Sequence, residues 1–224
     1  MLIAGIIKNS FVDFPGLISA VLFTPGCNMN CWYCHNEGIK ADKDLNFDNF
    51  LKFLETRKNF LDGVVFSGGE PTLQKDLKSC IKKVKSMGFK IKLDTNGLNP
   101  EVVEDLLKEN LLDYIAMDIK APEERYSEIT RCEIDLNKIK KSIEIIKNSG
   151  IDYEFRTTLS PDLYLDDVEK MSKMIKGAKK YAIQQYRQMC YQTTRIEKPH
   201  EPDYIKMAVE IAKQYVTNTI SRGV

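Results

Sequence analysis

The sequence predicts an α/β fold: a partial (β/α)6 barrel with parallel strands inside and helices outside, forming a single domain over residues 1–224. Six short apolar runs alternate with lysine- and glutamate-rich segments of helical period, which is typical of repeated βα units. A polar cluster follows each apolar run, where a barrel's active-site rim would lie. Six units are too few for a closed eightfold barrel of about 250 residues, so we expect an open one.

The apolar runs predict strands at 17–24, 63–67, 89–94, 114–118, 151–158 and 181–186. The helical periods predict helices at 47–57, 73–87, 100–109, 136–148, 165–175 and 202–215. Gly88 and Gly150 follow two of these helices, where a positive φ ends a helix most easily. A short extra strand at 2–7 precedes the first unit, with a turn at 13–16 between them.

Composition excludes several classes of protein. A net charge of +1 gives no field for attracting nucleic acid or a membrane surface, so neither partner is expected. No apolar stretch approaches the ~20 residues of a membrane span, and the N-terminus lacks the basic region of a signal peptide. Three of the six cysteines are scattered (Cys80, Cys132 and Cys190), and we expect them to be buried free thiols. This usage predicts a cytoplasmic protein in a reducing compartment.

The other three cysteines carry the strongest chemical pattern. Cys27, Cys31 and Cys34 have the spacing C-x3-C-x2-C directly after an apolar run. Three thiolates can hold three irons of a cubane cluster and leave the fourth iron open to a substrate, whereas four would favour an electron carrier. Zinc held by the three thiolates and His35 is an alternative, although His35 is adjacent to Cys34 and zinc ligands are usually farther apart.

Three more clusters at strand ends each have two interpretations. Ser67-Gly-Gly-Glu-Pro71 is either a tight turn or a place where a ligand approaches the backbone beside the Glu70 charge. Asp94-Thr-Asn-Gly97 is either an Asx turn or a set of oxygen ligands. Asp118 and Lys120 share one side of a strand, and burying them inward requires partners, so a functional role is favoured at the rim.

Arg156 ends another predicted strand, where its planar guanidinium suits a carboxylate ligand. Trp32 and Tyr33 either pack the cysteine loop or form a platform for an aromatic ligand. His200 lies in a late polar stretch and is expected at the surface.

These motifs together resemble the radical S-adenosylmethionine (radical SAM) superfamily over essentially the whole chain. The resemblance rests on the cysteine motif, on Gly68-Gly-Glu-Pro71, and on Asp94-Thr-Asn-Gly97 and Met117-Asp-Ile-Lys120 in the same order. Asn9-Ser-Phe-Val-Asp-Phe-Pro-Gly16 and Cys34-His-Asn36 are similar to motifs of the glycyl-radical enzyme activating enzymes. The nearest branch is the activating protein of anaerobic ribonucleoside-triphosphate reductase.

The resemblance implies a barrel of the radical SAM type with one [4Fe-4S] cluster, held by Cys27, Cys31 and Cys34, whose open iron binds S-adenosylmethionine (SAM). It implies SAM contacts from Tyr33, Cys34 and His35 at the adenine, from Gly68, Gly69 and Glu70 at the ammonium, from Asp118, Ile119 and Lys120 at the ribose and methionyl end, and from Arg156 at the carboxylate. It further implies a monovalent cation near Asp94, Thr95 and Asp118. The chain departs from the family at Gln185-Tyr-Arg187, where pyruvate formate-lyase activating enzymes have a histidine.

The implied activity is an oxidoreductase that reductively cleaves SAM to a 5′-deoxyadenosyl radical and generates a glycyl radical on a partner enzyme. The implied partners are an anaerobic ribonucleotide reductase as the protein substrate and a flavodoxin or ferredoxin as the electron donor. Two alternatives remain open: a small-molecule enzyme similar to 7-carboxy-7-deazaguanine synthase, and a non-catalytic iron–sulfur carrier or zinc-binding module. SAM cleavage separates the carrier from both enzymes, because a carrier forms no 5′-deoxyadenosine.

Overall fold

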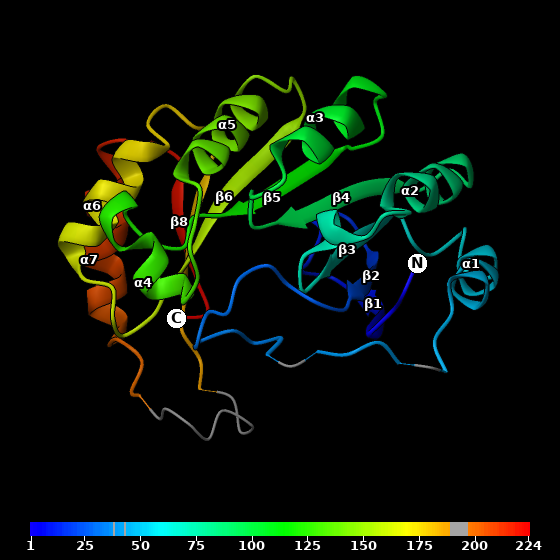
Figure 1. Cartoon of the computed structure of the whole chain (residues 1–224), viewed down its shortest axis with the longest axis horizontal. Helices are drawn as coiled ribbons and strands as arrows, with labels where there is room; N and C mark the ends of the chain where they lie inside the picture. Colours follow the sequence, from blue (N-terminus) through cyan, green and yellow to red (C-terminus); the bar gives the residue numbers. More distant parts are fainter. Residues whose placement is uncertain (38, 43, 189–196) are drawn as a thin grey trace.

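The computed structural model describes residues 1–37, 39–42, 44–188 and 197–224 (Figure 1). The strands are β1 (Gly5–Ser10), β2 (Ser19–Thr24), β3 (Gly63–Gly68), β4 (Lys90–Thr95), β5 (Tyr114–Asp118), β6 (Asp152–Leu159), β7 (Tyr181–Gln185) and β8 (Thr219–Arg222). The α-helices are α1 (Phe47–Glu55), α2 (Leu77–Ser86), α3 (Pro100–Lys108), α4 (Tyr126–Thr130), α5 (Leu136–Lys147), α6 (Leu165–Met174) and α7 (Pro202–Lys213). Two 3-10 turns, η1 (Pro71–Leu73) and η2 (Glu123–Arg125), complete the described elements.

The strands form one sheet whose spatial order follows the sequence from β1 to β8. Only β1 runs antiparallel to its neighbour, and every pair from β2 to β8 is parallel. The two ends of this order, β1 and β8, are not paired with each other in the described sheet, so the barrel is open as predicted. Helices α1, α2, α3, α5, α6 and α7 follow one another around the outside of the sheet (Figure 1).

All six predicted strands are confirmed to within two residues at each end. The extra N-terminal strand is real but lies at Gly5–Ser10 rather than 2–7, because Leu2 instead forms an isolated bridge with Asn46. Strand β8 was not predicted, since its four residues carry no clear apolar run. The turns at Gly88 and Gly150 have φ of 97° and 77°, which confirms the two predicted helix ends.

The predicted helix at 73–87 is wrong at its start. Glu70 accepts a hydrogen bond from the Thr72 backbone N–H, and a short 3-10 turn begins at Pro71. Gln74 then has extended backbone, so helix α2 begins only at Leu77. The polar residues after β3 therefore shape a turn rather than the first turn of a long helix.

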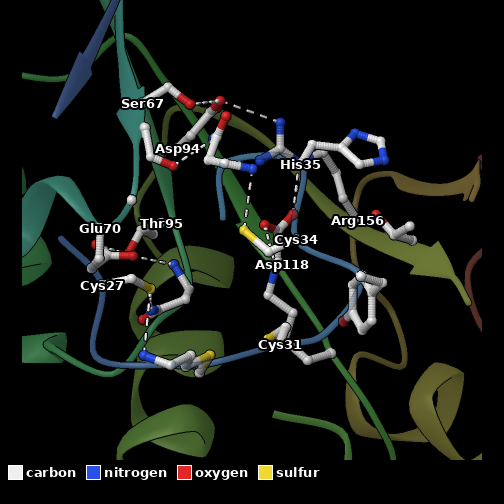
Figure 2. A pocket seen from close by; sticks show the side chains of 18 of the residues that line it. Cys27, Cys31, Cys34, His35, Ser67, Glu70, Asp94, Thr95, Asp118 and Arg156 are labelled. Atoms are coloured by element: carbon white, nitrogen blue, oxygen red, sulfur yellow. Dashed lines mark hydrogen bonds and ion pairs between the residues drawn. The ribbon is translucent and has the colours of Figure 1, made fainter. Parts of the chain in front are cut away.

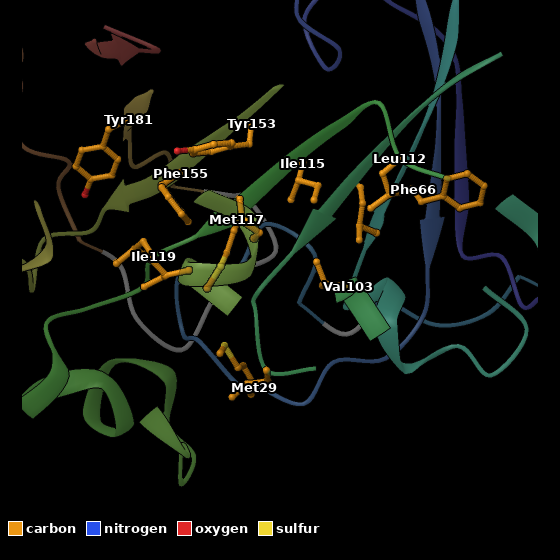
Figure 3. Close-up of a cluster of buried hydrophobic side chains, with 14 of the residues drawn as sticks. Met29, Phe66, Val103, Leu112, Ile115, Met117, Ile119, Tyr153, Phe155 and Tyr181 are labelled. Carbon is orange, nitrogen blue, oxygen red and sulfur yellow. The ribbon is translucent and has the colours of Figure 1, made fainter. Parts of the chain in front are cut away.

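The outer face of the sheet packs against the helices and forms the main hydrophobic core (Figure 3). Ile115 and Met117 of β5 are fully buried there, as are Phe155 of β6 and Val103 of α3. Burial of one such side chain contributes about 1.5–3 kcal/mol. This layer supplies the rigid scaffold on which the strand ends are held.

The inner face is divided into two parts. A small separate cluster of Phe14, Val21, Val65, Tyr114 and Ala116 fills the part near the strand starts. On β4, β5 and β6 the inward positions carry charged residues, among them Lys92, Asp94, Asp118, Glu154 and Arg156. Because side chains alternate across a strand, one set of strands builds both the apolar core and this polar interior.

Among the scattered cysteines, Cys80 is buried as predicted, whereas Cys132 is only half-buried and Cys190 lies outside the described residues. His200 is partly buried rather than a surface residue: its Nε2 lies 3.0 Å from the Leu163 carbonyl oxygen, and its ring stacks on Tyr204. Within the described ranges, no helix is both long and apolar enough to cross a membrane.

Candidate active site

The described part of the chain has a cavity of about 300 Å³ at the C-terminal ends of the parallel strands (Figure 2). The cysteine loop after β2 lines one side, and the ends of β3 to β7 line the rest. All of the polar clusters at the predicted strand ends therefore contribute to one cavity. Its lining residues are Asp13, Cys27, Met29, Cys31, Tyr33, Cys34, His35, Asn36, Ser67, Gly68, Gly69, Glu70, Asp94, Thr95, Asn96, Asp118, Lys120, Arg156, Thr158 and Gln184.

All three cysteines of the motif line this cavity, with Cys27 exposed, Cys34 half-buried and Cys31 buried. The backbone N–H of Met29 donates to Cys27 Sγ at 3.4 Å, and that of Asn36 donates to Cys34 Sγ at 3.3 Å. Donors that point at sulfur stabilise thiolates and influence the reduction potential of an iron–sulfur cluster. The chemistry of this donor set therefore fits a cluster.

Burial raises the pKa of Cys27 and raises that of Cys31 to about 11. Metal binding must therefore displace protons from these thiols. No three His, Cys, Asp or Glu side chains converge on a single metal-ion position among the described residues. A zinc site needs its ligands close together in a compact tetrahedron. A cubane separates its ligand sulfurs more widely, because each sulfur binds a different iron.

The glycines after β3 are required by contact with the cysteine loop. A Cβ on Gly69 would lie 1.9 Å from the Gly26 carbonyl oxygen, and one on Gly68 would lie 2.3 Å from the Thr24 nitrogen. Gly68 also has a φ of 117°, which side chains rarely adopt. The sequence predicted that these glycines make room for a ligand. At their two Cβ positions, however, the space is filled by the backbone of Thr24 and Gly26, which leads into Cys27.

Glu70 is buried and lies where β3 ends, beside the cysteine loop. Its Oε1 accepts hydrogen bonds from the hydroxyls of Thr72 (2.5 Å) and Thr95 (2.9 Å), and its Oε2 accepts one from the Asn96 backbone N–H at 2.7 Å. Burial raises the pKa of Glu70, although these donors oppose the rise. The carboxylate therefore ties the ends of β3 and β4 together as well as lining the cavity.

Asp94, Asp118, Lys120 and Arg156 form one ion-paired group across β4, β5 and β6 (Figure 2). Arg156 Nε donates to Asp118 Oδ1 at 2.9 Å, and its Nη1 lies 3.4 Å from Asp94 Oδ2. Burial alone would raise the pKa of Asp118, but Arg156 and Lys120 outweigh it and lower the pKa to about 2. Burial would also raise the pKa of Asp94, but Arg156 and Lys92 outweigh it and lower that pKa. Both carboxylates are therefore ionised at neutral pH, and the group presents acidic and basic side chains to the cavity.

The remaining predicted contacts are placed as follows. Tyr33 is buried, and its hydroxyl has no hydrogen-bond partner in the described structure. An orphaned buried hydroxyl beside the cavity fits a site that is completed by a ligand. His35 is exposed at the rim, with Nε2 3.2 Å from the Arg187 carbonyl oxygen. Ile119 does not line the cavity: its side chain is buried in the main core, while its carbonyl accepts a hydrogen bond from Thr157.

Trp32 packs the loop rather than lining the cavity. Its Nε1 donates to Asp162 Oδ2 at 2.8 Å, and its ring lies 5.5 Å from that of Tyr186. Of the two readings of this residue, the geometry supports loop packing. Tyr33, its neighbour, does line the cavity.

Sequence reasoning did not single out several residues that the structure brings into the site. Asn36 Nδ2 donates to the Gly68 carbonyl oxygen at 2.7 Å, and Asn96 Nδ2 donates to Asn28 Oδ1 at 2.7 Å. These amides fasten the cysteine loop to the ends of β3 and β4. Asp13 also lines the cavity, from the turn between β1 and β2. Their signal was their place within the motifs Cys34-His-Asn36 and Asp94-Thr-Asn-Gly97, or within the turn at 13–16.

Comparisons with known proteins agree with this geometry. The profile of the Radical SAM superfamily matches residues 21–175. The chain is 38% identical over 240 positions to "Putative glycyl-radical enzyme activating enzyme MJ1227" of Methanocaldococcus jannaschii, covering 100% of this chain and 96% of that protein. It is 32% identical to the pyruvate formate-lyase-activating enzyme of Clostridium pasteurianum, covering 78% of this chain and 76% of that protein.

Among solved structures, SuiB of Streptococcus suis bound to S-adenosylmethionine superposes with a TM-score of 0.71 at 14% identity. The match covers 91% of this chain and 52% of SuiB, so this chain spans about half of that structure and the likeness shows the fold alone. The superfamily implies a [4Fe-4S] cluster and SAM, which agrees with the three thiols and the ion-paired side chains that line the cavity beside them. The chain therefore belongs to the radical SAM superfamily of enzymes, and it is similar over its whole length to glycyl-radical enzyme activating enzymes.

Proposed function

We propose that this enzyme generates a glycyl radical on a partner protein, and that the partner is an anaerobic ribonucleotide reductase. The observation that carries the proposal is a cavity in which three thiols of one loop face the ion-paired ends of β4, β5 and β6. When bound, the reduced cluster supplies one electron to SAM, which yields methionine and a 5′-deoxyadenosyl radical that removes hydrogen from a glycine. The full-length similarity to activating enzymes supports this class of reaction.

The residues of the chain would bind and orient the two groups. Cys27, Cys31 and Cys34 would hold three irons, and the Met29 and Asn36 N–H groups would stabilise two of the thiolates. The proposed ligands around SAM are Tyr33, Cys34 and His35 at the adenine, Gly68, Gly69 and Glu70 at the ammonium, Asp118, the Ile119 backbone and Lys120 at the ribose and methionyl end, and Arg156 at the carboxylate. Arg156 suits that role because its fork binds carboxylates in a fixed geometry.

The basic side chains at the cavity would orient the cofactor through its carboxylate. Lys120 and Arg156 of this group line the cavity and carry the positive charges there. An anionic carboxylate is the complement of these charges. Holding the reacting groups in a fixed arrangement lowers the entropic cost of the reaction.

The open barrel is an argument for a macromolecular substrate. Strands β1 and β8 are the two ends of the described sheet, and the cavity is lined by the cysteine loop after β2 on one side and by Gln184 of β7 on the other. A loop of a partner protein carrying the target glycine could enter such a barrel, whereas a closed barrel would admit only a small molecule. The proposal further places the protein in the cytoplasm, with a flavodoxin or ferredoxin as electron donor, because the thiol ligands require a reducing compartment.

The monovalent cation expected from the family resemblance is not part of the proposal. Asp94 already pairs with Lys92, and Asp118 already pairs with Lys120 and Arg156. These contacts leave the two carboxylates neutralised by side chains of the chain itself.

Electron paramagnetic resonance tests the proposal. Anaerobically reconstituted enzyme, SAM, a reductant and purified ribonucleotide reductase should produce a glycyl doublet, which disappears when the target glycine is replaced by alanine. A doublet on pyruvate formate-lyase instead would reassign the partner. Turnover of a small carboxylated pterin without any protein partner, and no doublet, would favour the small-molecule alternative. Formation of no 5′-deoxyadenosine would contradict the enzyme assignment.

A further inference from the structure

Lys92 is a buried lysine for which the proposed reaction has no role. It lies on β4 with 2% of its side chain exposed, two residues before Asp94. Residues two apart on a strand share a face, so both point into the barrel. An ammonium group in such a place is costly unless it is paired, and its Nζ lies 2.5 Å from Asp94 Oδ1. The ion pair with Asp94 is therefore what stabilises the Lys92 ammonium inside the barrel.

The oxygens that a metal cation would need are already engaged. The second oxygen of Asp94, Oδ2, accepts a hydrogen bond from the Ser67 hydroxyl at 2.9 Å. The Thr95 hydroxyl donates to Glu70 Oε1 at 2.9 Å and accepts from the Gly97 backbone N–H at 3.1 Å. The donor set expected for a monovalent cation is thus used for hydrogen bonds and ion pairs within the chain.

Asp118, the third expected ligand, is occupied on both oxygens. Its Oδ1 accepts from Arg156 Nε at 2.9 Å, and its Oδ2 accepts from Lys120 Nζ at 2.9 Å. Lys92, Lys120 and Arg156 exceed Asp94 and Asp118 by one positive charge, and Glu154, which also acts on Lys92 and Arg156, is itself paired with Lys180 and Arg222. A further cation among them would be repelled at contact distance in a poorly solvated interior. The residues present do not fit a metal cation.

We propose that the Lys92 ammonium is the built-in counter-cation of Asp94, taking the place of an alkali-metal ion, so that SAM binding by this enzyme does not depend on such ions. Lys92 is a positioning residue: it keeps Asp94 neutralised, and Asp94 in turn holds one end of Arg156. The inference deepens the proposed function, since it rests on SAM being the ligand of the cavity.

The first test uses the unaltered holoenzyme. SAM affinity is measured by equilibrium dialysis in potassium, sodium and choline chloride at equal ionic strength. Affinities within about twofold in the three salts are expected. Binding that is about tenfold tighter in potassium or sodium than in choline would show that a metal cation is needed, and would overturn the proposal.

The second test removes the ammonium while keeping the volume of the side chain. Lys92→Met should bind SAM about tenfold more weakly in choline and recover in potassium, because the exposed Asp94 charge then attracts the ion. Lys92→Met/Asp94→Asn should lose this recovery. The matched control is Lys90→Met, on the same strand, where the lysine is 62% exposed and pairs with Asp113. It should behave as the unaltered enzyme in every salt.

Two results in this series would overturn the proposal: unchanged affinity of Lys92→Met in choline, or weak binding that no alkali ion restores. The unfolding temperature of each apoprotein in the three salts provides a readout without SAM, in which only Lys92→Met should gain stability from potassium. If the unaltered enzyme bound no SAM in any salt, the proposed function would fail, while the unfolding series would still decide the role of Lys92. If Lys92→Met does not fold, the first test alone decides.

Discussion

Strands β4, β5 and β6 present apolar side chains to the helices on one face and charged side chains to the barrel interior on the other. Outward positions such as Leu93, Ile115 and Phe155 are fully buried in the main core. Inward positions such as Asp118 and Arg156 are also largely shielded from water, with 25% and 13% of their side chains exposed. One set of strands therefore buries an apolar core completely on one face and shields charged side chains partly on the other.

The difference shows what each face must achieve. Apolar packing tolerates a small change of shape at a moderate cost, because every neighbour contributes a little of the energy. A buried charge depends on one or two partners, and losing a partner leaves the other uncompensated. We therefore expect outward substitutions to lower stability alone and substitutions of the inward charged residues at the cavity to change ligand binding or pH dependence, and four predictions test this division.

Arg156→Met should have the largest effect, weakening SAM binding about 10–100-fold, which corresponds to the loss of a charge-assisted hydrogen bond. Equilibrium dialysis of the reconstituted enzyme measures it. The control is Arg222→Lys, which lies on the same inner face but pairs with Glu154 outside the cavity at 2.6 Å. Its affinity should stay within about twofold. Equal losses of SAM affinity in both variants would show that Arg156 acts through the scaffold and not through the binding site.

Ile115→Ala should lower the free energy of unfolding by about 2–4 kcal/mol, because it opens a cavity in the outer core. For a chain of this size the unfolding temperature should fall by roughly 4–16 °C in calorimetry. Ile115→Val should cost only about 0.5–1.5 kcal/mol. SAM affinity measured well below both transitions should not change, and a loss of affinity would mean that the two faces are coupled.

Asp118→Asn tests the pH dependence of the inner face. The folded pKa of Asp118, about 2, lies below its usual 3.8 because Arg156 and Lys120 outweigh burial. Its ionisation therefore stabilises the fold by about 2 kcal/mol above pH 4, and this is lost as the pH falls toward 2. Denaturant titrations from pH 2 to 7 should show the difference between unaltered and Asp118→Asn proteins closing on acidification.

A matched control for that titration is Asp152→Asn, because Asp152 is 80% exposed on the same sheet. Its difference from the unaltered protein should stay near zero throughout. A gap between the Asp118→Asn and unaltered proteins that stays constant down to pH 2 would contradict ion pairing as its cause.

Tyr114→Phe should have the smallest effect. Its hydroxyl donates to Glu154 Oε2 at 3.2 Å, at the boundary between the inner apolar cluster and the charged interior. Loss of this bond should destabilise the protein by about 1 kcal/mol in denaturant titration, without altering SAM affinity. A larger change in SAM affinity than in the free energy of unfolding would show that the SAM site extends to Tyr114.

The sequence predicted the parts of the fold that depend on local periodicity. The six strands follow from apolar runs, and the meeting of Cys31, Asp94 and Arg156 at one rim follows because parallel strands end at the same edge. The start of α2 was wrong because Glu70 caps a separate 3-10 turn, a side-chain contact that periodicity does not reveal.

Lys92 could not be recognised from its own segment. Lys90 and Lys92 alternate with apolar residues, and this pattern equally describes a solvated face of a strand. Lys92 is shielded inside the barrel beside Asp94, while Lys90, on the same face at the strand's start, is exposed. The alternating pairs Lys92/Asp94 and Asp118/Lys120 were the available signal, since opposite charges two apart recur on neighbouring strands.

The central claim is that three cysteines hold a cluster whose open iron binds SAM. Anaerobic reconstitution followed by metal analysis and assay of 5′-deoxyadenosine tests it directly, with Cys31→Ala beside Cys80→Ala, whose thiol is buried on α2 away from the cavity. We predict a [4Fe-4S] cluster and SAM cleavage in the unaltered and Cys80→Ala proteins, and neither in Cys31→Ala. Zinc in place of iron, or intact SAM under strong reductant with a full cluster, would contradict the claim.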